Sequence, residues 1–335
     1  MHKLLAAILL IAAAAPARAA EADHFTLPDA ELVDITAEVN RLANDGLRAA
    51  IDDLNAQGGC DDSAKSEELL YDRLTDVFSN HKKGQLVRAI IDGDVPRTVI
   101  PLKESLYSEW SIWNGFLLGR RGAAKSPLAL SPLIKIGDVV IGVDKLEHMF
   151  GMGQRYFKGH YLNGKPLVSV LKGGIFKEKT FLGGNMLATG VFSYADLAAN
   201  FNGMRFWNHM LQKRDDVLGA QHNAGPYLTC SAGKWTASAE RPIDLRTYVD
   251  ATMQESINCS KFATAAGARK FHEGLAAMQA KSGARIFSCP ENPGLLDDTA
   301  RKYEVEIAGD SRGSTVDHWI INREGNGKVS YFNEF

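Results

Sequence analysis

Apolar residues recur at helical spacing along most of the chain. In residues 30–56, Leu32, Ile35, Val39, Leu42 and Leu47 form one stripe, and Gly46 is expected to bend or divide the helix. The same pattern predicts helices over residues 63–81, 144–160, 166–180, 193–213, 243–258 and 266–281. The first two of these stretches, 30–56 and 63–81, resemble a helical hairpin.

Extended patterns are fewer and shorter. Residues 135–143 form an apolar run typical of a buried strand, and residues 226–235 are expected to form a short hairpin. The tail after Tyr303 alternates, which predicts a small sheet or hairpin with Asn326-Gly327 as its turn. The fold class we predict is therefore mainly α, with a small β hairpin or sheet near the C-terminus.

The first twenty residues have the pattern of an export signal. His2 and Lys3 precede an apolar stretch, and Ala17-Arg18-Ala19 offers a small-x-small cleavage site, so we predict a signal peptide over residues 1–20, cleaved near Ala19 or Ala20. The alternative is an uncleaved interfacial anchor. No later run of apolar residues is long enough to span a bilayer, so we expect no stable membrane insertion and a periplasmic or secreted protein. Residues 21–95 would then form the N-terminal helical hairpin and residues 96–335 the main domain with its β appendage.

The amino-acid composition further restricts the class of protein. The chain is 45% hydrophobic and 23% charged, with a formal net charge of −2, which indicates a globular protein and argues against a nucleic-acid partner. We expect a monomer. In an oxidising compartment the four cysteines predict one or two disulfides among three possible connectivities, and Cys259–Cys289 is the pairing we favour.

Polar side chains that carry chemistry gather in residues 144–160. On a helix, Asp144, Glu147 and His148 share one side near its start. Glu147 lies beside apolar residues of its own helix, where desolvation favours a proton-donating carboxyl, so it is a candidate general acid. Asp144 and His148, with His160, are instead candidate metal ligands. In a third interpretation Asp144 caps the helix and His148 is satisfied within the core.

A second polar group follows at residues 193–200. Ser193 is a good helix N-cap with Asp196 at the third helical position, and Asp196 and Asn200 lie one turn apart. The small residues Ala198, Ala199 and Gly203 would permit close helix packing or close approach of a substrate.

Aromatic residues concentrate further upstream, and no common catalytic motif accompanies them. Tyr107, Trp110, Trp113 and Phe116 fit either core packing or a platform on which sugars stack. The chain has no P-loop, no GxGxxG, no GxSxG and no HExxH, so nothing points to a nucleotide, a flavin or a serine hydrolase, and we predict no cofactor.

Three segments together resemble a known family. They are DKLEHMFGMGQRYF (residues 144–157), GVFSYADLAANFNGMRFW (residues 190–207) and TMQESINCSKF (residues 252–262). They are similar to the deacetylation-specific lysozymes of predatory bacteria, which are exported peptidoglycan hydrolases that cut glycan strands containing deacetylated sugars. The resemblance runs over roughly residues 100–300. It implies a lysozyme-like helical domain, peptidoglycan glycan strands as the partner, and one catalytic Glu that maps best onto Glu147.

The hypothesis that follows is glycoside hydrolysis with Glu147 as the proton donor. Tyr156 and Tyr194 are the candidates to assist where no second acid is present. The expected substrate-binding residues are Asp144, His148, Asp196, Asn200, Trp110 and Trp113, and the candidates to receive a free sugar amine are Asp144, Asp196 and Glu178. Two rivals remain: a metal-dependent periplasmic hydrolase that uses Asp144, His148 and His160, and a cell-wall-binding protein without catalysis.

Overall fold

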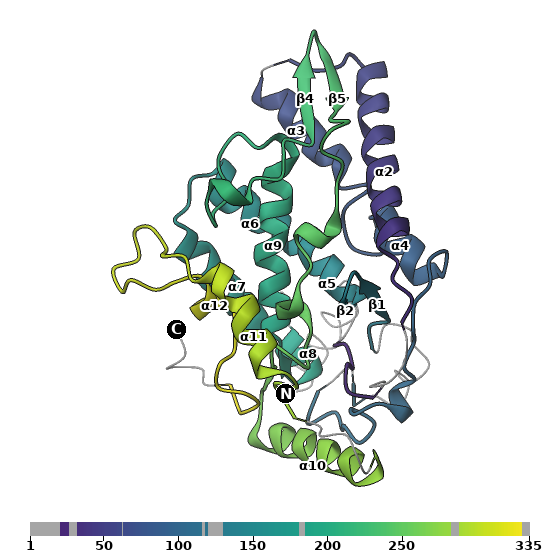
Figure 1. The fold of residues 1–335 in the computed structure, drawn as a ribbon, viewed down its shortest axis with the longest axis vertical. Coiled ribbons are helices and arrows are strands. Elements are labelled where there is room, and N and C mark those ends of the chain that lie inside the picture. Colours follow the sequence, from purple (N-terminus) through teal and green to yellow (C-terminus); the bar gives the residue numbers. More distant parts are fainter. Residues whose placement is uncertain are drawn as a thin grey trace, which may run out of the picture.

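The structure is a computed structural model that describes residues 21–26, 32–61, 63–115, 118–119, 130–180, 185–282 and 288–329 (Figure 1). Helices dominate, as the sequence predicts, and the sheets are small. The helices are α2 (Thr36–Ala56), α3 (Ala64–Leu74), α4 (Gln85–Asp92), α5 (Val143–Glu147), α6 (Gly153–Phe157), α7 (Leu167–Lys179), α8 (Asn185–Thr189), α9 (Tyr194–Leu211), α10 (Ala265–Ser282), α11 (Pro293–Ala300) and α12 (Asp317–Ile320).

The strands form three antiparallel pairs in the described part of the chain. β1 (Leu133–Ile136) pairs with β2 (Val139–Gly142), β3 (Val191–Phe192) with β6 (Lys261–Phe262), and β4 (Leu228–Ser231) with β5 (Lys234–Ala237). The last pair is the hairpin that the sequence predicts at residues 226–235. Its two-residue turn places Ala232 and Gly233 at positive φ, which matches the twist of a tight hairpin.

Helix α9 is the centre of the molecule, and α6 runs beside it (Figure 1). Every residue of α9 from Tyr194 to Met210 is buried. Its start follows the predicted cap, because the Ser193 hydroxyl accepts a hydrogen bond from the backbone N–H of Asp196. A helix buried on all sides brings its polar residues into the core, where they need partners from other elements.

Two glycines let α9 and its neighbour touch backbone to backbone. A Cβ atom on Gly153 would lie 2.5 Å from Cα of Gly203, and a Cβ atom on Gly203 would lie 2.0 Å from the carbonyl oxygen of Met149. Larger side chains would therefore push the two helices apart. The close helix packing that the small residues of α9 predict is confirmed at Gly203.

The segment predicted as a helix over residues 144–160 is one helical run from Val143 to Leu162. It is not regular: α5 passes into a π-helical turn at His148–Met152, then into α6, and then into a second π-helical turn at Lys158–Leu162. Such π-helical turns occur frequently at functional sites, because the extra residue changes the direction of the side chains around it.

The N-terminal helices pack on this central pair. α2 contacts α3, α4 and the β4–β5 hairpin, and α4 contacts α5. Apolar residues from both sides of the predicted boundary at residue 95 belong to one core cluster. Gly46 does not divide α2; a Cβ atom there would lie 2.4 Å from the Val77 side chain, so the glycine serves close packing.

Three predicted elements differ in part from the structure. α2 begins at Thr36 rather than at residue 30, because Asp34, two residues earlier, bridges to β1 and accepts a hydrogen bond from the Thr36 N–H. The run 135–143 is a hairpin rather than one strand, with its turn at Gly137 in the left-handed region. In the tail, Asp317–Ile320 is helical, and the Val329 N–H bonds the carbonyl of Phe262 instead of an adjacent hairpin arm.

The predicted helix over residues 243–258 is wrong. The chain there forms two short 3-10 turns, Leu245–Thr247 and Ala251–Met253. Each begins where an aspartate, Asp244 or Asp250, accepts a hydrogen bond from the backbone N–H two residues ahead. Such local side-chain bonds compete with a continuous helix, and apolar periodicity alone does not register them.

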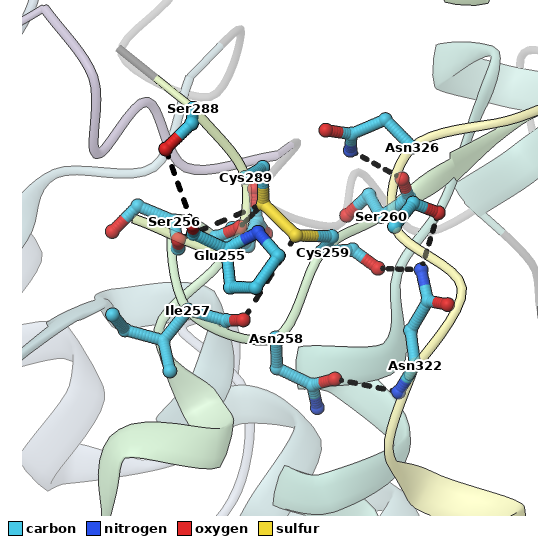
Figure 2. The surroundings of a disulfide bond; sticks show 12 residues. Glu255, Ser256, Ile257, Asn258, Cys259, Ser260, Ser288, Cys289, Asn322 and Asn326 are labelled. Atoms are coloured by element: carbon cyan, nitrogen blue, oxygen red, sulfur yellow. Dashed lines mark hydrogen bonds between the residues drawn. A yellow bond between two sulfur atoms is a disulfide. The ribbon is translucent and has the colours of Figure 1, made fainter. Parts of the chain in front are cut away.

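Two disulfides join distant parts of the chain. Cys60 pairs with Cys230, and Cys259 pairs with Cys289, which confirms the pairing favoured from the sequence. Figure 2 shows that the second disulfide lies beside Glu255 and Asn258; the Asn258 side chain also accepts a bond from the backbone of Asn322. The two disulfides are compatible with an extracellular location. None of the helices in the described ranges is long and apolar enough to cross a membrane.

Candidate functional site

A fully buried lysine organises the polar interior. The ammonium nitrogen Nζ of Lys145 lies 2.5 Å from Asp144 Oδ2, 2.7 Å from Asp196 Oδ1 and 2.6 Å from Glu255 Oε1. These carboxylates come from α5, α9 and the segment beside the Cys259–Cys289 disulfide. Burial alone would lower the pKa of Lys145, but the three carboxylates raise it well above its usual range. Lys145 is therefore a permanent cation at the junction of three segments.

His148 continues this network one helical turn away. Its Nε2 lies 3.0 Å from Asp196 Oδ2, and its Nδ1 lies 3.1 Å from Asn200 Oδ1. Burial lowers the pKa of His148, yet the Asp196 carboxylate outweighs burial and the pKa rises to about 9. Both ring nitrogens then donate at neutral pH.

Two buried carboxyls of the network, Glu178 and Glu255, have raised pKa values. Burial raises the pKa of Glu178 to about 8, with Asp196 adding to the effect, and Glu178 accepts a bond from the Ser193 N–H. Burial likewise raises the pKa of Glu255 to about 7, although Lys145 acts in the opposite direction. Asp196 behaves differently: despite burial, His148 and Lys145 together lower its pKa. The network therefore holds both charged and protonated carboxyls near neutral pH.

Glu147 points away from this network. It is 7% exposed, and its Oε1 accepts hydrogen bonds from the backbone N–H of His81 at 2.7 Å and lies 2.6 Å from His81 Nδ1. His81 lies in the turn between α3 and α4. The N-terminal helices thus supply the residue that holds Glu147 in place.

A cavity of about 170 Å³ opens beside Glu147. It is lined by Ser79, Asn80, Glu147, His148, Gly151, Met152, Gln154 and Arg155. The first π-helical turn forms its floor, and a Cβ atom on Gly151 would meet no heavy atom within 4 Å. Gln154 adds a buried amide nitrogen without a hydrogen-bond partner among the described residues. Of the described residues that line the cavity, Glu147 is the only carboxylate.

The structure separates the other predicted site residues. Trp110 is buried with Tyr107 and Phe262 in a second apolar cluster, whereas Trp113 is 85% exposed. Tyr156 and Tyr194 are buried and do not line the cavity, so their catalytic role stays a prediction. Phe116 lies outside the described residues. Only Glu147 and His148 of the predicted set reach the cavity wall.

The predicted metal ligands do not converge. His160 bonds the carbonyl of Lys165 through Nδ1 at 2.9 Å, on the second π-helical turn. Among the described residues, the group whose ligand atoms come within 4.8 Å of one another is Asp144, Asp196 and Glu255. Each of these carboxylates is already paired with the ammonium group of Lys145. The donor set thus fits a lysine better than a metal ion.

Sequence reasoning missed the residues that complete the site. Lys145 lies next to the predicted residues but carries no spacing signal of its own, and Glu255 lies in a segment whose pattern predicts a helix. His81 stands alone in a polar turn, with no spacing to connect it to Glu147. These contacts join positions 66 to 110 residues apart, so no local pattern encodes them.

Comparison with models of protein families, with curated proteins and with solved structures finds no match.

Replacing Lys145 by Met should destabilise the protein strongly. Removing the ammonium leaves three buried carboxylates without their partner, which costs about 3–5 kcal/mol of unfolding free energy. Denaturant unfolding of the disulfide-bonded protein measures this loss of unfolding free energy. The control is Lys103→Met at an exposed position, whose unfolding free energy should lie within about 0.5 kcal/mol of the wild type. Adding Glu255→Gln should restore part of the loss. An unchanged unfolding free energy in Lys145→Met would contradict the central role of this cation.

The protein should lose stability as pH rises from 6 to 9.5. The pKa of Glu178 is about 8 in the folded protein and 4.5 in the unfolded chain. The pKa of His148 is about 9 in the folded protein and 6.5 in the unfolded chain. The folded state binds more protons in this window, so each step up in pH favours unfolding. We expect the melting temperature to fall by a few degrees, and less in Glu178→Gln than in the exposed control Glu273→Gln. A melting temperature that rises over this window would contradict the assignment.

Proposed function

We propose that this chain is an exported hydrolase of peptidoglycan glycan strands in which Glu147 donates the proton. One observation carries the proposal: a single nearly buried carboxylate lies on the wall of a polar cavity and is held there by His81. Cleavage of a glycosidic bond requires a positioned acid at the leaving oxygen. The resemblance of the three segments to deacetylation-specific lysozymes supports the same role for Glu147.

The cavity offers the other contacts that a sugar needs. Gln154 and Asn80 bring side-chain amides to the wall, and Arg155 brings a guanidinium group. His148 offers only the carbon face and edge of its ring, because both ring nitrogens are bonded to Asp196 and Asn200. The open space over Gly151 leaves room for a ring at the π-helical turn. Since Tyr156 and Tyr194 lie inside the core, we assign the attack on the sugar carbon to a water molecule, and assistance by either tyrosine stays a prediction.

The compartment belongs to the same proposal. We infer that residues 1–20 are a signal peptide cleaved near Ala19 or Ala20, and that the mature protein is periplasmic or secreted. The two disulfides and the partner polymer, which lies outside the inner membrane, are consistent with this location.

Glu147→Gln should abolish cleavage while the fold survives. Glutamine keeps the shape and still accepts the His81 N–H bond, but it has no proton to give, so we expect release of glycan fragments from purified sacculi to fall by about 10²–10⁴-fold. The matched control is Glu273→Gln, an exposed change on α10. Mass spectrometry of the products and melting curves of both variants complete the measurement.

The activity and binding measurements distinguish the proposed glycosidase from the two alternative functions. A folded Glu147→Gln that digests sacculi at the wild-type rate would overturn the acid assignment. Loss of wild-type activity to a chelator, with a stoichiometric metal found by elemental analysis, would favour the metal-dependent hydrolase. Binding to sacculi without any product would favour the cell-wall-binding protein.

Chemically deacetylated peptidoglycan should be cut faster than acetylated material. This preference rests on the resemblance alone, because Asp144, Asp196 and Glu178 lie in the buried network and do not line the cavity. Initial rates on sacculi before deacetylation, after it, and after chemical reacetylation measure the effect. Equal rates on all three would leave a general lysozyme.

A further inference from the structure

The segment that follows the predicted signal peptide is buried. Residues Glu21, Ala22, Asp23, His24 and Phe25 are each at most 6% exposed. Chain ends are normally exposed and poorly ordered unless specific contacts hold them. If the leader is removed, this buried segment becomes the N-terminus of the mature protein.

Specific contacts hold the segment along its length. The Asp23 carboxylate accepts hydrogen bonds from the backbone N–H groups of Phe25, Thr26 and Leu106. His24 Nε2 lies 3.1 Å from the carbonyl oxygen of Val140 on β2. Phe25 stacks edge to face on Phe271 of α10 at 5.3 Å. The segment therefore connects β2, α10 and the turn at residue 106.

Its first residues lie against the Lys145 network. The carbonyl of Glu21 accepts a hydrogen bond from the Ser131 N–H, and the Ser131 hydroxyl accepts one from the Asp144 N–H. A Cβ atom on Gly142 would come within 2.1 Å of Asp144 Oδ1 and within 2.6 Å of Cβ of Ala22. Asp144 and the start of the mature chain thus face the same small space.

The network holds more carboxyl groups than cations, and two carboxyl oxygens at this point lack a hydrogen-bond donor among the described residues. Its buried carboxyls are Glu21, Asp144, Glu178, Asp196 and Glu255, against two cations, Lys145 and His148. Oε2 of Glu21 and Oδ1 of Asp144 are buried and have no hydrogen-bond partner in the described part of the chain. Burial raises the pKa of Glu21 well above its usual range, and the charges of Glu255 and Asp196 raise it further. Unpaired buried oxygens of this kind are costly, so they indicate a missing donor.

We propose that the α-ammonium group created by leader cleavage is this donor, and that it binds the free oxygens of Glu21 and Asp144. Hydrolysis of the peptide bond after Ala19 or Ala20 consumes one water. The leader leaves with a carboxylate, and the mature chain keeps an amine that takes up a proton to become an ammonium.

The new ammonium group lies close to Glu21 because the two are joined by at most one residue of chain. After cleavage at Ala20 the ammonium is the nitrogen of Glu21 itself, and after cleavage at Ala19 it lies one residue, about 3.8 Å between Cα atoms, further out. The uncut chain has a neutral amide at the same place. Processing therefore adds a third cation to the network only after export, and the mature fold is more stable than the precursor fold.

The inference rests on the export proposed above and not on the hydrolase activity. It is tested on the exported, disulfide-bonded protein without any activity measurement, so its failure would leave the glycan-hydrolase proposal as it stands. Intact mass first establishes the N-terminal residue. The folded protein is then labelled with an amine-reactive acetylating reagent near pH 7, and the N-terminal peptide is quantified by mass spectrometry against the denatured protein.

A two-residue insertion supplies the comparison. Ser-Gly placed between Ala20 and Glu21 keeps the cleavage site but moves the ammonium away from the network; the control has Ser-Gly between the exposed residues Ala239 and Glu240. Pairing with carboxylates raises an amine's pKa by a unit or more, so we expect labelling of the native N-terminus to be at least about tenfold slower than in the insertion variant. We also expect a lower melting temperature for the insertion at residue 20 than for the control, and a smaller difference when both carry Glu21→Gln.

Three results would overturn the proposal. They are a mature protein that retains the leader, an N-terminus that is labelled equally fast in the folded and the denatured protein, and an insertion at residue 20 that changes neither labelling nor melting temperature. If the insertion variant fails to fold, Glu21→Gln takes its place, because it keeps the segment buried but removes one carboxylate, and labelling as slow as in the wild type would overturn the proposal.

Discussion

The pairing of Lys145 with three buried carboxylates is the interaction on which the rest of the structure depends. Moving an ammonium and its counter-ions out of water costs several kcal/mol per ion, and only close contacts of good geometry offset that cost. The three contacts, at 2.5–2.7 Å, come from α5, α9 and the segment beside the Cys259–Cys289 disulfide. Displacing one of these segments would leave a buried charge unpaired. The glycine contact between α6 and α9 and the disulfide beside Glu255 (Figure 2) are therefore parts of one arrangement.

Local patterns predicted those parts of the fold that local forces determine. The helices α2, α7, α9 and α10 follow apolar stripes, and the start of α9 follows the Ser193 cap. The helix predicted over residues 243–258 is wrong because Asp244 and Asp250 accept hydrogen bonds from nearby backbone N–H groups, and the spacing of apolar residues contains no information about such bonds. Of the candidate site, the sequence placed Asp144, Glu147 and His148 on one helix correctly. It could not reveal Glu255 or His81, whose contacts depend on chain segments brought together only by the whole fold.

Glu147 and Asp144 show why spacing on a helix is not enough to assign chemistry. They lie three residues apart on α5 and were expected to share a face. In the structure Asp144 enters the Lys145 network, whereas Glu147 turns toward His81 and the cavity. The π-helical turn that begins at His148 changes the direction of the following residues, so Gly151, Met152 and Gln154 line the cavity as well. One short helix therefore serves both the charged interior and the candidate site.

His148 joins these two environments, and this gives the buried network a functional meaning. Its ring lines the cavity, while its nitrogens bond Asp196 and Asn200 in the interior. Because Asp196 is itself paired with Lys145, the orientation and charge of the ring on the cavity wall are determined by a rigid network and not by solvent. A site whose side chains are held in this way has little reorganisation to undergo when a substrate binds, which is the condition under which fixed dipoles and charges act most strongly on a reaction. The charges of the interior, including the ammonium charge that a mature N-terminus would add, thus influence the cavity through a single imidazole ring.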